Sequence, residues 1–155
     1  MAFTASKAYT SFLTDALNNA AALALGADTL KLSLFDNTVT PDQTVASALT
    51  AYGAGVWASG GVFDASGWPA AGRPLASVTS TFSGGIYTLD AADVASANGT
   101  TTLGNTYGAL LYDSTIASPV ANQGFGFMYF GGAASVTSGT FTVVLNGSGV
   151  FQLSL

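Results

Sequence analysis

Cysteine and histidine are both absent from this chain of 155 residues. Without cysteine the protein can form neither disulfides nor thiolate metal sites, and its redox compartment stays open. Without histidine it lacks the usual general base and the commonest transition-metal ligand. A Ser/His/Asp or Cys/His nucleophile set is therefore excluded. No phosphate-binding or dinucleotide-binding glycine motif is complete either. We expect a protein that is not an enzyme and that holds no cofactor or metal.

Charge is scarce as well. Only 7% of the residues are charged, against about 25% in a typical soluble domain. Three cations face eight aspartates and no glutamate, so the formal net charge is −5. Nucleic-acid binding begins with Lys and Arg contacts to phosphate, so we expect no nucleic-acid partner. Because interspersed charge normally keeps small domains apart, we expect partner chains, including copies of this one, to cover much of the surface.

Long apolar runs are also missing, which predicts no transmembrane helix and no membrane partner. The N-terminus has one cation, Lys7, before an Ala/Leu-rich stretch. Asp15, Asn18 and Asn19 interrupt that stretch, so we expect no cleaved signal peptide.

The length predicts one domain over residues 1–155. Its N-terminal part, residues 4–25, predicts one amphipathic helix that Thr4 or Ser6 caps and Gly26 ends. The apolar face of this helix either packs on the sheet of its own subunit or docks on a neighbouring one. The residues on that face are Tyr9, Phe12, Leu13, Ala16, Leu17, Ala20, Leu23 and Ala24.

A half-buried strand is predicted over residues 28–35, where Leu alternates with Thr, Lys and Ser. The glycine-rich region 43–76 follows, with a possible short helix over 45–52, a short strand over 57–62 and a loop over 68–74. Its large aromatic residues either anchor a partner surface or fix the loop to its own sheet. The candidate subunit-contact residues are Trp57, Phe63, Trp68 and Arg73, together with Tyr9 and Phe12.

The β-rich core is predicted over residues 75–155. Strands at 75–82 and 86–89 form a hairpin, Asp90 caps a turn, and 95–105 is a polar connection. A β-meander follows, whose last two strands pair across the turn 146–149. The predicted strands of the meander are 107–112, 124–130, 140–145 and 150–155. The fold class is therefore mainly β, with β-sandwich-like antiparallel sheets and one N-terminal amphipathic α-helix.

One strand of the meander is apolar on both faces. In residues 124–130, Phe125, Phe127 and Tyr129 occupy one face, and Met128 and Phe130 the other. Such a strand needs cover on both sides, from a helix, a second sheet or another subunit.

Aspartates are the only acidic groups available for chemistry. The pair Asp90 and Asp93, or Asp36 with Asn37 and Asp42, offers oxygen atoms that suit Ca²⁺ but lacks the spacing of a known calcium loop. We expect these residues to cap and to form turns. Asn98 and Asn146 match the glycosylation triplet, yet each precedes glycine, and we expect turns there too.

Short motifs in a fixed order connect the chain with a known family. They are Lys-Ala-Tyr at residues 7–9, the strand 28–35 with Thr-Pro-Asp at 40–42, Leu-Asp-Ala-Ala-Asp-Val at 89–94, Tyr-Gly-Ala-Leu-Leu-Tyr-Asp at 107–113, Gly-Thr-Phe-Thr at 139–142 and Gly-Val-Phe-Gln-Leu at 149–153. In this order the chain resembles the small virion structural proteins of tailed bacteriophages, particularly those of actinobacterial hosts.

The resemblance implies a β-sandwich-like core and a capsid decoration protein on the outer surface of the head, made in the cytoplasm of a bacterial host. Its partners would be the major capsid protein and copies of itself. One alternative is a tail or tail-tip component. Another, of a different class, is a carbohydrate-binding surface module that stacks Trp57, Trp68 and tyrosines on sugars; a metal-dependent hydrolase built on aspartates is more remote.

Overall fold

The computed structural model describes residues 3–18, 20–21 and 23–154. The protein is mainly β, with 41% of residues in strands and 11% in helices, and all of its strand pairs are antiparallel. The mainly β class with antiparallel sheets is therefore confirmed.

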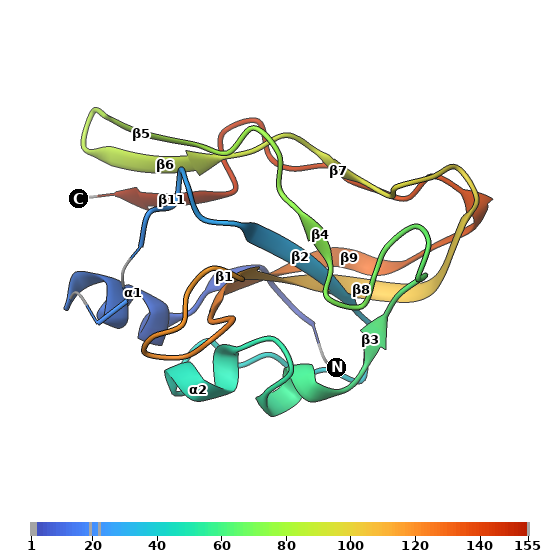
Figure 1. The fold of residues 1–155 in the computed structure, drawn as a ribbon, viewed down its shortest axis with the longest axis horizontal. Coiled ribbons are helices and arrows are strands. Elements are labelled where there is room, and N and C mark those ends of the chain that lie inside the picture. Colours follow the sequence, from blue (N-terminus) through green and yellow to red (C-terminus); the bar gives the residue numbers. More distant parts are fainter. Residues whose placement is uncertain (1–2, 19, 22, 155) are drawn as a thin grey trace.

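The central element is a six-stranded sheet (Figure 1). Its order is β1-β9-β8-β2-β3, with β4 also paired to β2. The longest strands, β8 and β9, form its middle and extend past the other strands as a ribbon. The bounds are β1 Lys7–Ala8, β2 Leu30–Phe35, β3 Gly61–Val62, β4 Arg73–Pro74, β8 Thr101–Asp113 and β9 Gly124–Gly139.

Two smaller sheets lie over one face of this central sheet (Figure 1). One has the order β11-β6-β5, and the other pairs β10 with β7. The opposite face carries the N-terminal segment, the helices α1 and α2 and a 3₁₀-helix, η1. The bounds are α1 Thr10–Leu17, α2 Ser47–Thr50, η1 Gly55–Ala58, β5 Thr79–Ser83, β6 Ile86–Asp90, β7 Val94–Ala95, β10 Thr142–Val143 and β11 Phe151–Ser154.

The N-terminal helix is much shorter than predicted. Residues 7–8 form β1 instead, in register with Gly126 and Phe127 of β9, and the backbone N–H of Tyr9 donates to the Phe125 carbonyl. The Oγ of Ser6 accepts from the Tyr129 amide, so Ser6 bonds the edge of β9 and does not cap the helix. Sheet pairing thus overrides the helical periodicity. Of the predicted helix, Asn19 and Ala22 lie outside the described residues.

Helix α1 ends at Asn18 rather than at Gly26. Residues 25–27 form a turn, in which the Asp28 carboxylate accepts from the Ala24 amide at 2.6 Å. This local side-chain bond offers the backbone an alternative to the helix, which is why aspartate favours turns.

The predicted four-stranded meander is wrong in its second half. Strands β8 and β9 do pair, but β10 pairs with β7 and β11 pairs with β6. The turn at 146–149 forms, with the Gly149 amide donating to the Asn146 carbonyl, yet the strands on either side of it enter different sheets. The strand predicted over 140–145 is reduced to Thr142–Val143.

Other predictions need smaller changes. The hairpin of β5 and β6 is confirmed, with Gly84 and Gly85 at positive φ in its turn. Strand β2 is confirmed, but it is not half-buried, because the side chain of Ser33 on its polar face is fully buried. The region 90–105 contains β7 and the start of β8 rather than a helical turn and a polar connection. The helix over 45–52 shortens to α2, and the strand over 57–62 becomes η1 and β3.

Gly108 of β8 shows why a small residue is needed in the centre of the sheet. A Cβ atom there would lie 2.3 Å from the Met128 carbonyl oxygen and 2.6 Å from the ring of Phe3. Because glycine has no Cβ atom, the Phe3 ring lies directly on the sheet, and its side chain is only 2% exposed.

Candidate contact surface

Two of the predicted contact residues, Trp57 and Tyr9, lie in the interior. The Trp57 indole N–H donates to the Tyr9 hydroxyl at 2.7 Å, and neither side chain is more than 2% exposed. The Trp57 ring lies edge-on to Phe35 at 4.8 Å between centroids, and Phe127 lies edge-on to Tyr9 at 5.5 Å. Burial raises the pKa of the Tyr9 phenol well above its ordinary value, so this hydroxyl stays protonated.

Trp68 and Phe12 are interior too. The indole N–H of Trp68 donates to the Leu32 carbonyl at 3.2 Å, and its ring lies edge-on to Phe141. The Phe12 ring lies 4.0 Å from that of Phe125, between centroids. Aromatic packing of this kind stabilises beyond the area that it buries.

The expectation that these four side chains contact a neighbouring subunit therefore fails for this chain. The alternatives hold instead: the tryptophans fix the glycine-rich region to its own sheet, and α1 packs on its own subunit through Phe12. Phe63, by contrast, is 57% exposed, and Arg73 is partly exposed beside β2. Of the six candidates, only these two are placed where a partner can reach them.

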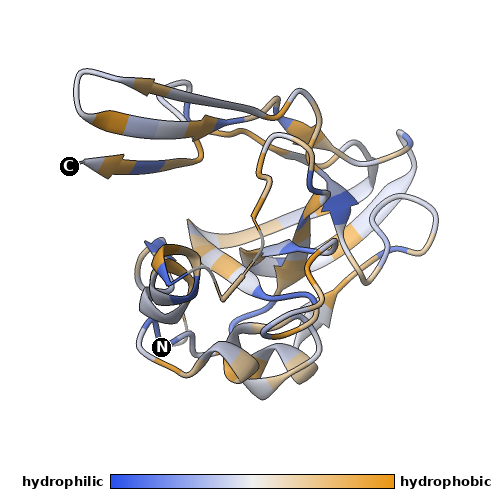
Figure 2. Cartoon of the chain, turned by 60° about the vertical axis from the view of Figure 1, so that its left-hand side comes forward, coloured by the Kyte–Doolittle hydropathy of each residue, from blue (hydrophilic) through white to orange (hydrophobic). Residues whose placement is uncertain are grey.

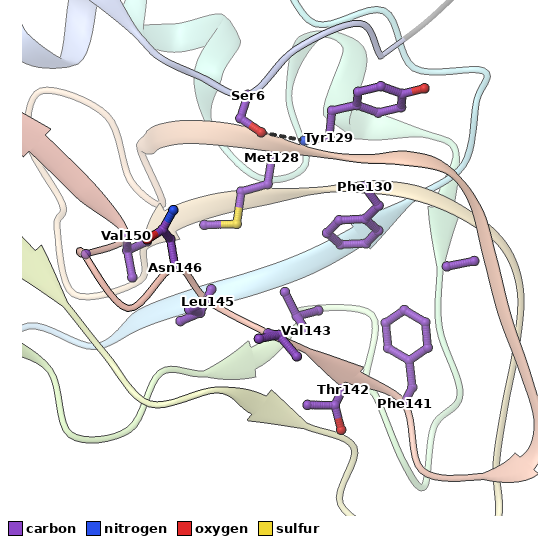
Figure 3. A pocket seen from close by; sticks show the side chains of 13 residues that line it. Ser6, Met128, Tyr129, Phe130, Phe141, Thr142, Val143, Leu145, Asn146 and Val150 are labelled. Atoms are coloured by element: carbon purple, nitrogen blue, oxygen red, sulfur yellow. Dashed lines mark hydrogen bonds between the residues drawn. The ribbon is translucent and has the colours of Figure 1, made fainter.

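The two apolar faces of β9 are covered by different parts of the chain. Phe127 and Tyr129 meet Phe3, and Phe127 also meets Tyr9, so the N-terminal segment covers their face. Met128 and Phe130 face residues 141–145 across a cavity (Figure 3). The second face is therefore covered by another part of the same chain, but incompletely.

This cavity has a volume of about 620 Å³ and is open to the outside. It lies between β9 and the segment that contains β10, and its walls are mostly apolar side chains (Figure 3). Val144, on its rim, is 75% exposed. Its principal side chains are those of Met128, Phe130, Phe141, Val143, Leu145 and Val150. Sequence reasoning identified the β9 side of this cavity but not the opposite wall, because it paired β10 with β11.

Charge is distributed unevenly along the chain. All eleven charged residues lie within residues 1–113, and residues 114–155 contain none. Strands β9, β10 and β11 belong to this uncharged part. Figure 2 shows the strand that ends at the label C, β11, with a hydrophilic position between hydrophobic ones. The cavity walls come almost entirely from the uncharged part.

The β11-β6-β5 sheet presents a second apolar surface. Phe82, Tyr87 and Leu153 oppose one another across its three strands and so share a face. Phe82 is 63% exposed, although Leu89 and Phe151 in the next row of the same face are buried or partly buried. One end of this sheet thus extends beyond the core.

Several aspartates accept from backbone amides, Asp36 and Asp42 in local turns as expected and Asp93 in a bond to a distant segment. Asp36 and Asp42 each accept from the amide and the hydroxyl of the threonine two residues on. Asp93 accepts from the Leu145 amide, and Asp90 from the Ala91 amide. Asn98 and Asn146 likewise accept from the amides of Thr100 and Ser148, which confirms their turns.

Two other carboxylates have shifted pKa values. The Asp64 carboxylate accepts from the amides of Thr102, Ser66 and Gly67 and from the Ser66 hydroxyl, and these bonds lower its pKa to about 2. Asp113 is fully buried, and its pKa is raised by burial and by the nearby Asp28. One oxygen of Asp113 accepts from two loop amides, while Oδ2 has no hydrogen-bond partner among the described residues.

Within the described ranges, acidic side chains do not gather in groups of three that would suit a metal ion. The helices of the same residues are all too short or too polar to cross a membrane. Comparisons of this chain with family models, with curated proteins and with solved structures found no match.

Proposed function

We propose that this chain is a non-enzymatic structural protein of a bacteriophage virion, and specifically a decoration protein on the outside of the capsid. It is made in the cytoplasm of a bacterial host and stabilises the head through contacts with the major capsid protein and with copies of itself. The ordered motifs from residue 7 to residue 153 support this proposal.

The uncharged C-terminal part is the single observation that carries the proposal furthest. Residues 114–154 supply small polar side chains and most of the apolar wall of an open cavity, and none of their side chains is charged. Apolar area contributes roughly 25 cal/mol per Å² when it is removed from water, before the costs of association are subtracted. Such a surface suits a protein that is bound between neighbouring subunits. On a protein that diffuses freely, the same surface would promote aggregation.

The position of the chain on the particle is the part to test first. Particles of a phage that encodes this chain are separated into heads and tails, and each fraction is examined by mass spectrometry. We expect the chain in heads, in a ratio to the major capsid protein that stays constant between preparations. Recovery only in tails would replace the proposal by the tail or tail-tip alternative, and absence from both would end it.

The carbohydrate-binding alternative has less support. It relied on Trp57 and Trp68 as platforms for sugar rings, and these side chains are 2% and 0% exposed. A glycan array with the wild type and with Phe63→Ala and Phe82→Ala variants tests two aromatic residues that are exposed, and unchanged weak binding would dismiss this alternative.

A further inference from the structure

The ribbon formed by β8 and β9 has two outer edges that the rest of the central sheet does not cover. Strand β2 pairs with β8 only along residues 108–113, and β1 pairs with β9 only at Gly126 and Phe127. Beyond these points β8 and β9 pair with each other as far as Thr101 and Gly139 (Figure 1). An uncovered strand edge presents unpaired N–H and C=O groups that can bind another strand.

The β8 edge of the ribbon is protected within the chain. The Thr102 amide donates to the Asp64 carboxylate at 2.8 Å, and the Ala97 amide donates to the Gly67 carbonyl. Gly67 lies so close to β8 that a Cβ atom on it would overlap the Thr101 side chain. A loop with a partly exposed carboxylate thus covers this edge at Thr101 and Thr102.

The β9 edge has no such protection. The last contact along it is the bond from the Tyr129 amide to the Ser6 hydroxyl, and none of the described residues pairs with the outer edge of residues 133–139. We call this stretch the free edge. Natural edge strands are guarded by lysine, proline, inward-pointing charge or β-bulges. The free edge has no lysine, proline or charge, although its register with β8 shifts on both sides of Val136. Ala133, Ser135 and Thr137 along it are exposed.

We propose that the free edge binds the free edge of a second copy of this chain, as an antiparallel β9–β9 pair about a two-fold axis. The occupant follows from charge. Two copies that each carry −5 repel one another, and the eleven charged residues all lie within residues 1–113. The free edge belongs to the uncharged part, so copies that meet there keep their aspartates away from the junction.

The symmetry of such a pair is determined by the strand direction. An antiparallel junction between identical edges requires a two-fold axis normal to the sheet, so the same residues meet on both sides. Centred on Ser135, it sets Ala133 of each copy opposite Thr137 of the other. The central sheet then continues from one copy into the next, and both cavities open on the same face. This inference rests on the proposed function in so far as copies of the chain meet on the capsid.

Charged substitutions along the free edge test the pairing. Sedimentation velocity would compare the wild type with a lysine variant, Ala133→Lys/Thr137→Lys, and an aspartate variant, Ala133→Asp/Thr137→Asp. We expect a wild-type dimer of about twice the 15.5 kDa chain mass, monomers for each variant alone, and a restored dimer when the two variants are mixed. Ser135 is left in place because its Oγ accepts from the Asn105 amide of β8.

The lysine variant separates pairing from overall charge. It changes the net charge from −5 to −5 + 2 = −3, which weakens general repulsion, and yet it is expected to be monomeric. The matched control is Thr79→Lys/Thr81→Lys on β5, an exposed edge strand of another sheet, which should leave the dimer intact. Loss of the dimer in the control but not in the free-edge variants would overturn the proposal.

Amide hydrogen exchange on the wild type gives a test that does not depend on how the variants fold. Protection of residues 133–139 should rise with protein concentration, while protection of β2 should not change. A wild-type chain that is monomeric at high concentration, with no such rise, would overturn the pairing. Recovery of the chain in heads would still support the proposed function in that case, so the two failures are distinguishable.

Discussion

The two faces of the central sheet are covered in different ways. On one face, the N-terminal segment and η1 bring Phe3, Tyr9 and Trp57 into direct contact with Phe127 and with one another. On the other face, Trp68 packs closely at the β2 end, but a cavity of about 620 Å³ separates β9 from residues 141–145. We call them the sealed face and the open face.

The sealed face stabilises the fold of this chain, whereas the open face is the surface that we propose for contacts with a neighbour. The two tryptophans of the glycine-rich region are typical of partner contacts, but both lie in the interior: Trp57 on the sealed face and Trp68 at the closely packed end of the open face. Uncharged apolar residues of the C-terminal part line the cavity of the open face, and small uncharged residues form the free edge. In a chain with so little charge, the surfaces proposed to contact partners are the ones that contain no charged residue.

Removing the ring of Trp57 should break the sealed face. Trp57→Ala removes contacts with Phe3, Phe35 and Phe127 and the donor to Tyr9. Losses for truncating a buried aromatic are about 3–5 kcal/mol, and we expect the free energy of unfolding to fall by that amount in urea titrations. Val144→Ala on the open face, where the side chain is 75% exposed, should change it by less than about 0.5 kcal/mol. Equal losses from the two variants would contradict the contrast.

Adding atoms should have opposite effects on the two faces. Gly108→Ala forces a Cβ against the Met128 carbonyl and the Phe3 ring, and overpacking of this kind costs about 3 kcal/mol. Differential scanning calorimetry would report it as a lower Tm.

The matched change on the open face is Ala134→Val, which adds two methyl groups at the cavity wall. Filling such a space, with a residue that favours strands, should raise stability by up to about 1 kcal/mol. A destabilisation as large as that of Gly108→Ala would mean that the cavity closes in solution.

Lowering the pH should change the stability of the fold in two opposing ways, through Asp113 and Asp64. These are the smallest of the expected effects. The pKa of Asp113 is raised above its ordinary 3.8, mainly by burial, so the folded chain binds more protons than the unfolded chain between pH 3.8 and the folded pKa. Stability therefore falls as the pH rises through that window. Asp64, with a pKa of about 2, contributes stability above pH 4 that is lost as the pH falls towards 2.

Urea midpoints measured from pH 2 to pH 7 should therefore pass through a maximum near pH 4. Asp113→Asn keeps the oxygen that accepts from the Thr115 and Ile116 amides and removes the buried charge. We expect it to raise the midpoint at pH 7 and to flatten the decline above pH 4. A variant less stable than the wild type at pH 7 would show that the Asp113 carboxylate is stabilised by a partner in solution.

Local patterns predicted the fold class and several elements. Alternating leucines predicted β2, the paired glycines predicted the β5–β6 hairpin, and asparagine followed by glycine predicted two turns. In each case the residues that determine the element lie within it. The aromatic pattern of residues 124–130 also predicted that β9 needs cover on both faces.

Pairing between distant residues could not be predicted in the same way. The helical spacing of residues 4–25 is genuine, but sheet pairing with β9, more than a hundred residues away, takes residues 7–8 out of the helix. The glycine turn at 146–149 suggests a hairpin, but only the core decides that β11 joins β6. The free edge has no sequence signal of its own. A strand edge is free only when no other strand pairs with it, and that depends on the whole fold.

The contact of Phe3 with Phe127 has a consequence for synthesis. These residues are 127 − 3 = 124 positions apart, and the ribosome makes the first of them long before the second. Until β8 and β9 have emerged from the ribosome, Phe3, Tyr9 and Phe12 have no sheet to cover. The N-terminal segment therefore stays unfolded until then. Closing so long a loop is slow. Docking of the N-terminal segment is therefore expected to be a late step of folding, after β9 has emerged from the ribosome.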